Sequence, residues 1–260
     1  MNPFEWFDRE NEKPLDFLVT DGGFSRIFRS ICCIGDSLSS GEFETVDEAG
    51  TTHFNDIYEQ SWGQYLARMN GAKVHNFSRG GMTAREYCES FADSMDFWNP
   101  KYASQAYIIA LGVNDLINWG HPIGTIDDID LLDWRNNGPT FVGYYGQIIQ
   151  RMKELQPNAR FFFMTMPRSD EDQEAQTQLR QIHSDLLYQM AELFPNSYVL
   201  DFHQYAPVYD QRFRDLYYLR GHMNPCGYVL TAQMVASYLD YIIRHNIDKF
   251  IDVGLVGNLM

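Results

Sequence analysis

The stretch ICCIGDSLS, residues 31–39, runs from apolar residues straight into a glycine, an acid and a serine. Its first half is rich in β-branched and other apolar side chains, which is typical of a buried strand. Such a strand ordinarily ends in turn residues, whereas this one ends in the hydroxyl of Ser37. The fold and the function of the chain both depend on what lies around that hydroxyl.

Five apolar runs of this kind recur along the chain. They span residues 30–34, 73–77, 106–111, 160–166 and 197–202. Their apolar character is continuous rather than alternating, which indicates strands covered on both faces, as in a parallel sheet. Helical patterns follow or separate them, at residues 61–71, 83–99, 139–155, 175–193 and after Pro225. This alternation predicts a three-layer α/β/α sandwich with a central five-stranded parallel sheet, a flavodoxin-like arrangement.

The helical segments carry further signals. Capping boxes of the form Ser/Thr-x-x-Glu/Gln begin at Ser61 and Thr83. In residues 175–193, apolar side chains at three- and four-residue steps predict one buried stripe. Its members are Leu179, Ile182, Leu186, Met190 and Leu193. We predict a single domain over residues 30–260, preceded by an arm of residues 1–29.

The composition excludes several classes of partner. A formal net charge of -15 opposes binding to nucleic acid and to anionic lipid surfaces. No run approaches the ~18 apolar residues of a membrane span, and the acidic start lacks the features of a secretory signal. The four cysteines have no metal-ligand spacing, so we expect buried thiols in a reducing compartment, most simply the cytoplasm. No histidine pair has ligand spacing either, and we predict no metal site and no cofactor.

Polar residues stand where the predicted strands end. Ser37 follows the first strand, Gly80 and Gly81 follow the second, and Asn114 follows the third; His222 comes after the fifth. In an open parallel sheet these ends meet at one edge, where ligands bind. A serine hydroxyl needs a neighbouring base, which the imidazole supplies, and a tetrahedral intermediate needs preplaced donors for its oxyanion. The N–H groups of Ser37 and Gly81 and the amide of Asn114 are candidate donors, so the set predicts acyl transfer.

The same residues resemble the sequence blocks of the SGNH, or GDSL, hydrolases. Residues 35–38 read GDSL, a glycine follows the second strand, residues 112–115 read GVND, and a late histidine precedes the last helix. The resemblance covers residues 31–241. It implies the SGNH hydrolase fold, with Ser37 as nucleophile, Gly81 and Asn114 as oxyanion donors and His222 as general base. It favours Gly81 over Gly80 because the family's block has an asparagine five residues before the glycine, here Asn76.

One position departs from the family pattern. The family places an aspartate three residues before the histidine, where this chain has Leu219. We expect a Ser–His dyad in which the Leu219 carbonyl orients His222, with an acid from elsewhere, such as Asp215, as the alternative. Asp36 is expected to brace the loop as a hydrogen-bond acceptor. Arg79 is either a ligand for an anionic group of the substrate or a solvated arginine.

The predicted function is hydrolysis of carboxylic esters through an acyl-Ser37 intermediate. The resemblance implies a small-molecule substrate with a short acyl chain such as acetyl, and an acylated carbohydrate is one candidate. Two irregular connections, residues 41–60 and 121–138, are expected to shape the binding mouth. Four aromatic side chains either stack on a sugar or, as is more common, pack in the core or at the rim: Trp119, Trp134, Tyr144 and Tyr145. Acyl transfer to an alcohol, a lipase or thioesterase activity, and an inactive glycan- or protein-binding module are the alternatives.

Overall fold

The core of the molecule is a five-stranded parallel sheet. The computed structural model describes residues 9–253. The strands lie in the order β4-β1-β5-β6-β7, and their bounds are β1 Ser30–Gly35, β4 Lys73–Ser78, β5 Ala106–Ala110, β6 Arg160–Met164 and β7 Ser197–Leu200. Each coincides with a predicted apolar run to within two residues. The predicted fold class is confirmed.

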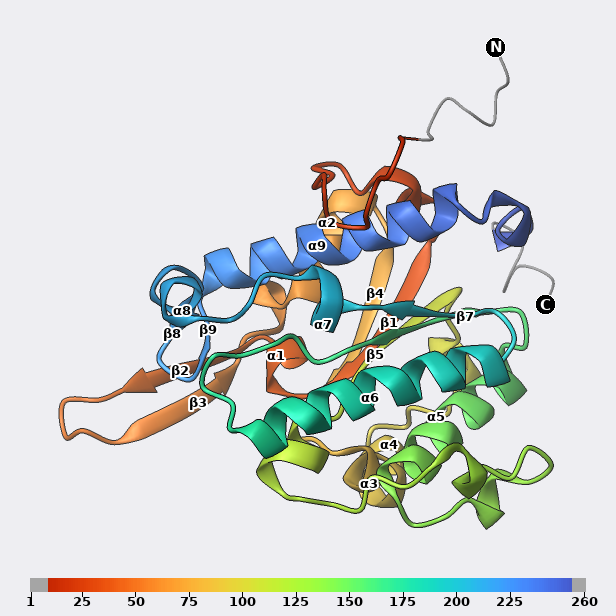
Figure 1. Cartoon of the computed structure of the whole chain (residues 1–260), viewed down its shortest axis with the longest axis horizontal. Coiled ribbons are helices and arrows are strands. Elements are labelled where there is room, and N and C mark those ends of the chain that lie inside the picture. Colours follow the sequence, from red (N-terminus) through yellow and green to blue (C-terminus); the bar gives the residue numbers. More distant parts are fainter. Residues whose placement is uncertain (1–8, 254–260) are drawn as a thin grey trace.

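Helices cover both faces of this sheet (Figure 1). Helices α2 (Trp62–Asn70) and α9 (Pro225–Arg244) pack on one face. The other face carries α3 (Ala84–Glu86), α4 (Ala92–Ser94), α5 (Phe141–Leu155) and α6 (Glu174–Leu193). Because side chains alternate along a strand, neighbouring residues of β1 enter different cores. Cys32 belongs to the cluster under α5 and α6, and Cys33 to the cluster under α2 and α9.

Local signals explain where these helices begin and end. The Oγ of Ser61 accepts the Gln64 N–H at 3.2 Å, and that of Thr83 accepts the Glu86 N–H at 3.0 Å, so the N-cap bond of each predicted capping box is present. Helix α2 stops at Gly71, whose φ of 74° is the left-handed conformation that glycine tolerates.

Two predictions about burial were wrong. Ile182, assigned to the buried stripe of α6, is 44% exposed, whereas its neighbour His183 is fully buried. Helix α6 turns His183 rather than Ile182 toward the core, because the imidazole of His183 bonds to the carbonyl of Leu111, directly after β5, at 3.1 Å. Of the four cysteines, all free thiols, Cys226 is exposed rather than buried, since it lies in the first turn of α9.

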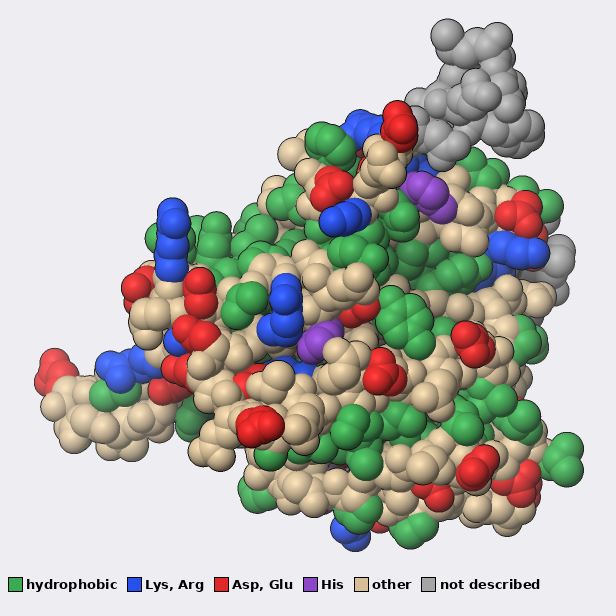
Figure 2. Space-filling model, in the orientation of Figure 1, with side chains coloured by type: hydrophobic (Ala, Val, Ile, Leu, Met, Phe, Trp, Pro, Cys, Tyr) green, Lys and Arg blue, Asp and Glu red, His purple; other side chains and the backbone are tan. Residues whose placement is uncertain are grey.

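Residues 41–60, expected to be irregular, include an antiparallel hairpin instead. It consists of β2 (Glu42–Val46) and β3 (Thr52–Asp56) and projects from the body of the molecule, as Figures 1 and 2 show. The shorter elements are α1 (Ser37–Ser40), α7 (Phe202–Tyr205), α8 (Gln211–Tyr217), and the two-residue strands β8 (Tyr218–Leu219) and β9 (His222–Met223). Of these, α1, β8 and β9 contact β2. Helix α8 and the β8–β9 turn thus bring residue 222 to the hairpin.

The described part of the N-terminal arm, residues 9–29, packs along α9. Arg244 of that helix pairs with Glu12 at 2.8 Å, and the Val19 N–H donates to Ser237 Oγ at 2.9 Å. A 3₁₀ turn, η2 (Gly23–Ile27), adds further contacts with α9. Among the helices of residues 9–253, none combines the length and the apolar character needed to cross a membrane.

Candidate active site

Ser37 stands at the point where β1 passes into helix α1. Asp36 is the N-cap of that helix, and its carboxylate accepts the Leu38 N–H at 3.1 Å. This bond confines the turn, so the hydroxyl of Ser37 is presented at the carboxyl edge of the sheet. Burial raises the pKa of Asp36 to about 7, and the Leu38 N–H opposes that rise only in part. The expected bracing role of Asp36 therefore has a direct structural counterpart.

The loop after β4 forms a tight turn closed by the Met82 N–H and the Arg79 carbonyl at 3.2 Å. Gly81 has a φ of 73°, which most other residues would adopt only under strain. At Gly80 a Cβ would lie 2.0 Å from Oε2 of Glu42, so a larger residue there would displace that carboxylate. Arg79 lines the cavity described below, yet its guanidinium is already paired with Glu86.

Asn114 is held in a defined orientation after β5, within a π-helical turn, η6 (Val113–Asn118). Its Nδ2 donates to the Met82 carbonyl at 3.1 Å, and its Oδ1 accepts from Nδ2 of Asn118 at 2.8 Å. One N–H of the amide is thereby committed, which leaves the other as a donor for a ligand. Asn118 was not identified from the sequence, although its four-residue spacing from Asn114 is the signal that would have found it.

The loops after β4 and β5 are tied together. The buried carboxylate of Asp115 accepts the Ala84 N–H with both oxygens, at 3.0 and 3.1 Å. Behind them, His183 supports the start of the second loop, and a Cβ on Gly112 would lie 2.6 Å from its Nε2. Burial lowers the pKa of His183 to about 4, so the imidazole is neutral and donates to the Leu111 carbonyl. The Gly81 and Asn114 loops therefore form one rigid unit.

His222, on β9, lies between two carboxylates of the hairpin. Its Nε2 is 2.9 Å from Oε1 of Glu42, and its Nδ1 is 3.6 Å from Oε2 of Glu44. Within residues 9–253 the structure has no hydrogen bond between His222 and the hydroxyl of Ser37. Burial is the main cause that raises the pKa of Glu42, and the charge of His222 opposes the rise.

Neither expected partner is hydrogen-bonded to the imidazole. The Nδ1 atom of His222 is buried and has no hydrogen-bond partner among the described residues, so the bond it was expected to donate to the Leu219 carbonyl is absent. Leu219 itself is 43% exposed in the short β8–β9 pair. Asp215 accepts a hydrogen bond from Gln211 at 2.7 Å on the solvent side of α8. Sequence reasoning missed Glu42 and Glu44 because no local spacing links them to His222.

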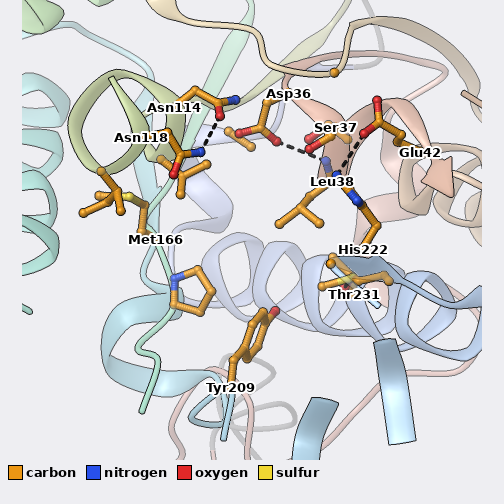
Figure 3. A pocket seen from close by; sticks show the side chains of 18 of the residues that line it. Asp36, Ser37, Leu38, Glu42, Asn114, Asn118, Met166, Tyr209, His222 and Thr231 are labelled. Atoms are coloured by element: carbon orange, nitrogen blue, oxygen red, sulfur yellow. Dashed lines mark hydrogen bonds and ion pairs between the residues drawn. The ribbon is translucent and has the colours of Figure 1, made fainter. Parts of the chain in front are cut away.

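A cavity of about 860 Å³ joins these parts (Figure 3). Ser37, Gly81, Asn114 and His222 all line it, together with Asp36 and Arg79. In Figure 3 the side chains of Ser37, Glu42 and His222 gather on one wall and those of Asn114 and Asn118 on the opposite one. The geometry suits nucleophilic attack by a hydroxyl, with a base on one side and oxyanion donors on the other.

The aromatic lining of the cavity comes from residues other than the four candidates for stacking on a sugar. None of the four predicted aromatic side chains, at positions 119, 134, 144 and 145, lines it, and the connection 121–138 contributes no residue to its wall. The aromatic residues that do are Phe54, Trp62, Phe202, Tyr209 and Tyr218. The hairpin, by contrast, supplies three residues of the wall, so residues 41–60 do border the cavity: Glu42, Phe54 and Asp56.

Comparisons with known proteins match the family and the fold of this chain. Residues 33–230 match the model of the GDSL-like lipase/acylhydrolase family. No curated protein matches the chain. A carbohydrate esterase family 2 enzyme with a carbohydrate-binding domain, from Corynascus thermopiles (Myceliophthora fergusii), is 15% identical with a TM-score of 0.57, covering 83% of this chain and 66% of its own.

Two further solved structures share the fold. A family two carbohydrate esterase from Clostridium thermocellum, in complex with cellohexaose, is 18% identical with a TM-score of 0.55, covering 85% of this chain and 65% of its own. The esterase EstA from a Pseudoalteromonas species, inhibited by monoethylphosphonate, is 14% identical with a TM-score of 0.54, covering 83% and 98%. This chain thus spans about two thirds of the two carbohydrate esterases.

Proposed function

This chain belongs to the GDSL-like lipase/acylhydrolase family and is a carboxylic ester hydrolase, and from that premise we propose that Ser37 is its nucleophile and His222 its general base. The observation that carries the proposal is the convergence of four separate loops on one cavity. The Ser37 hydroxyl attacks the ester carbonyl and gives its proton to Nε2 of His222. The N–H groups of Ser37 and Gly81 and the amide of Asn114 stabilise the resulting oxyanion.

The remaining steps follow from the same groups. The tetrahedral intermediate collapses as the imidazolium returns its proton to the leaving alcohol, which leaves an acyl group on Ser37. Water, deprotonated by His222, then attacks the acyl-enzyme and releases the acid. In the free protein Nε2 is engaged by Glu42. The first step therefore requires that the Ser37 hydroxyl replace this carboxylate as the partner of Nε2.

For the substrate we propose a short-chain acyl ester, such as an acetyl ester, carried on a carbohydrate. The fold relatives from Corynascus thermopiles and Clostridium thermocellum, both carbohydrate esterases, support this choice. The cavity volume lies within the range of sites for small molecules, about 300–1,000 Å³. Its lining is mixed: Ile117, Met164 and Met166 offer an acyl group an apolar wall, while Asp56 and Arg79 offer polar groups to an alcohol portion.

Hydrolysis of p-nitrophenyl acetate tests the nucleophile. We expect Ser37→Ala to abolish turnover and to prevent labelling by a fluorophosphonate, while the thermal unfolding temperature stays close to that of the unchanged protein. Ser39→Ala is the matched control, since Ser39 lies in the same helix but accepts a hydrogen bond from the Trp62 indole at 3.3 Å. Labelling that persists in Ser37→Ala would exclude Ser37 as the nucleophile.

A series of substrates tests the specificity. We expect kcat/KM to fall as the acyl chain of the p-nitrophenyl ester is lengthened from acetyl to octanoyl. We also expect release of acetate from acetylated xylo-oligosaccharides. Preference for the longest chain, without acetate release, would point instead to a lipid ester as the substrate.

A further inference from the structure

One nitrogen of the His222 imidazole, Nδ1, lacks a hydrogen-bond partner among the described residues. In a serine–histidine pair the nitrogen remote from the serine donates its N–H to an acceptor, which fixes the tautomer and stabilises the imidazolium. Here Nδ1 is buried and has no hydrogen-bond partner within residues 9–253. Buried polar atoms are rarely left without a partner, so we expect an acceptor close to Nδ1.

Strand alternation turns one face of the β2–β3 hairpin toward this imidazole. Glu42 and Glu44, two residues apart, point to the same side of β2, and their partners across the ladder are Asp56 and Phe54. The Phe54 ring lies edge-on to His222 with the ring centres 5.8 Å apart. The hairpin therefore presents two carboxylates and an aromatic ring to the imidazole.

Glu44 lies on the side of Nδ1 and is fixed there by the backbone. Its Oε2 is 3.6 Å from Nδ1 and accepts the Gly221 N–H at 2.9 Å. A Cβ at position 221 would lie 2.6 Å from that oxygen, so this close approach depends on a glycine. The Glu44 side chain is only 16% exposed, which limits the screening of its charge by water.

Glu42 does not suit the same role. Its Oε1 is bound to Nε2, the nitrogen that exchanges a proton with Ser37, so it competes with the nucleophile. Its Oε2 lies against Gly80, beside the loop that carries an oxyanion donor, where a negative charge opposes the developing oxyanion. Asp215 is engaged with Gln211 on α8. Glu44 is thus the described carboxylate best placed to serve Nδ1.

We propose that Glu44, contributed by the projecting hairpin, is the positioning residue that orients His222 and stabilises its imidazolium, in place of the acid absent at Leu219. This inference rests on the proposed roles of Ser37 and His222. The separation of 3.6 Å exceeds a hydrogen bond. Catalytic hydrogen bonds of unliganded enzymes are often long and tighten when substrate binds. Release of Nε2 from Glu42 to Ser37 is the step that lets the ring shift toward Glu44.

The kinetic test compares Glu44→Gln with Asp47→Asn. Both changes neutralise one carboxylate of the hairpin region, but Asp47 pairs with His53 in solvent, away from the cavity. We expect Glu44→Gln to lower kcat by on the order of 10²-fold with little change in KM, a smaller loss than that of an orienting aspartate whose replacement gives the wrong tautomer. In the pH profile of kcat/KM, the acidic limb of the Glu44→Gln variant moves to lower pH. Glu44→Asp restores part of the loss, and Asp47→Asn stays within about twofold.

A second readout does not require turnover. The His222 ring proton is followed by NMR over a pH titration in the Ser37→Ala background, with and without Glu44→Gln. A lower titration midpoint in the double variant supports Glu44 as the partner, even if no ester is hydrolysed by the unchanged protein. Absence of ester hydrolysis by the unchanged protein, together with failed fluorophosphonate labelling, would overturn the proposed function. An unchanged midpoint, or a kcat that falls only in Asp215→Asn, would overturn the role of Glu44.

Discussion

Replacement of Asp36 by asparagine tests whether burial of this carboxylate controls how stability depends on pH. Burial raises the pKa of Asp36 from 3.8 to about 7 in the folded protein. Between these values the folded state keeps a proton that the unfolded chain has released, so stability decreases as pH rises. At 1.36 kcal/mol per pKa unit, the decrease is at most ~4 kcal/mol and is complete above about pH 7.

The asparagine variant lacks this titration but keeps the cap. Its side-chain carbonyl can still accept the Leu38 N–H, which Asp36 binds at 3.1 Å. We therefore expect Asp36→Asn to gain stability relative to the unchanged protein as pH rises, by as much as ~4 kcal/mol from about pH 4 to about pH 8. The titrations of other groups, including the depressed pKa of His183, are common to both proteins and cancel in this difference.

Urea unfolding at a series of pH values, followed by tryptophan fluorescence, measures the difference. Asp133→Asn is the matched control, because Asp133 also caps a helical turn but its side chain is 41% exposed. We expect the control to change little across the range. A stability difference between Asp36→Asn and the unchanged protein that stays constant from about pH 4 to about pH 8 would refute the reasoning.

Two further substitutions probe the loops of the site. Gly112→Ala places a Cβ 2.6 Å from Nε2 of His183 at a φ of 136°, and we expect it to lower the free energy of unfolding by about 2–4 kcal/mol. Urea unfolding measures this, and a loss below about 1 kcal/mol would show that the loop adapts. Glu42→Gln weakens the competitor for Nε2, since charge-assisted hydrogen bonds are about twice as strong as neutral ones. We expect kcat/KM for p-nitrophenyl acetate to rise severalfold at neutral pH, and a tenfold fall would contradict a merely competing role.

The sheet could be predicted from the sequence because its strands are buried on both faces. A continuous apolar run as short as residues 30–34, bounded by turn residues, is typical of a strand in the middle of a parallel sheet. The polar residues that directly follow these strands also indicated that a site lies at the carboxyl edge of the sheet. What could not be predicted is orientation within a helix, as α6 illustrates. Apolar periodicity favoured Ile182, but a carbonyl at the end of β5 favoured the imidazole of His183.

The hairpin marks the limit of sequence reasoning for the site. Glu42 and Glu44 lie on alternate positions of β2, a pattern that a strand with one polar face shares with many solvated strands. Their relation to His222 depends on α8 and the β8–β9 turn, which place a distant segment against the hairpin. The departure at Leu219 was visible in the sequence, and it indicated that an acid was missing. Only the structure offers a source for it.

The hydrogen bonds that the Ala84 N–H donates to Asp115 and that the Asn114 amide donates to the Met82 carbonyl have a consequence for motion. A fluctuation that lifts either loop carries the other with it, because each holds the other's backbone. The loops that follow two different strands, β4 and β5, are therefore expected to move together. We therefore expect the Gly81 N–H and the Asn114 amide, the two proposed oxyanion donors that these loops carry, to be displaced together rather than one at a time when the protein is warmed.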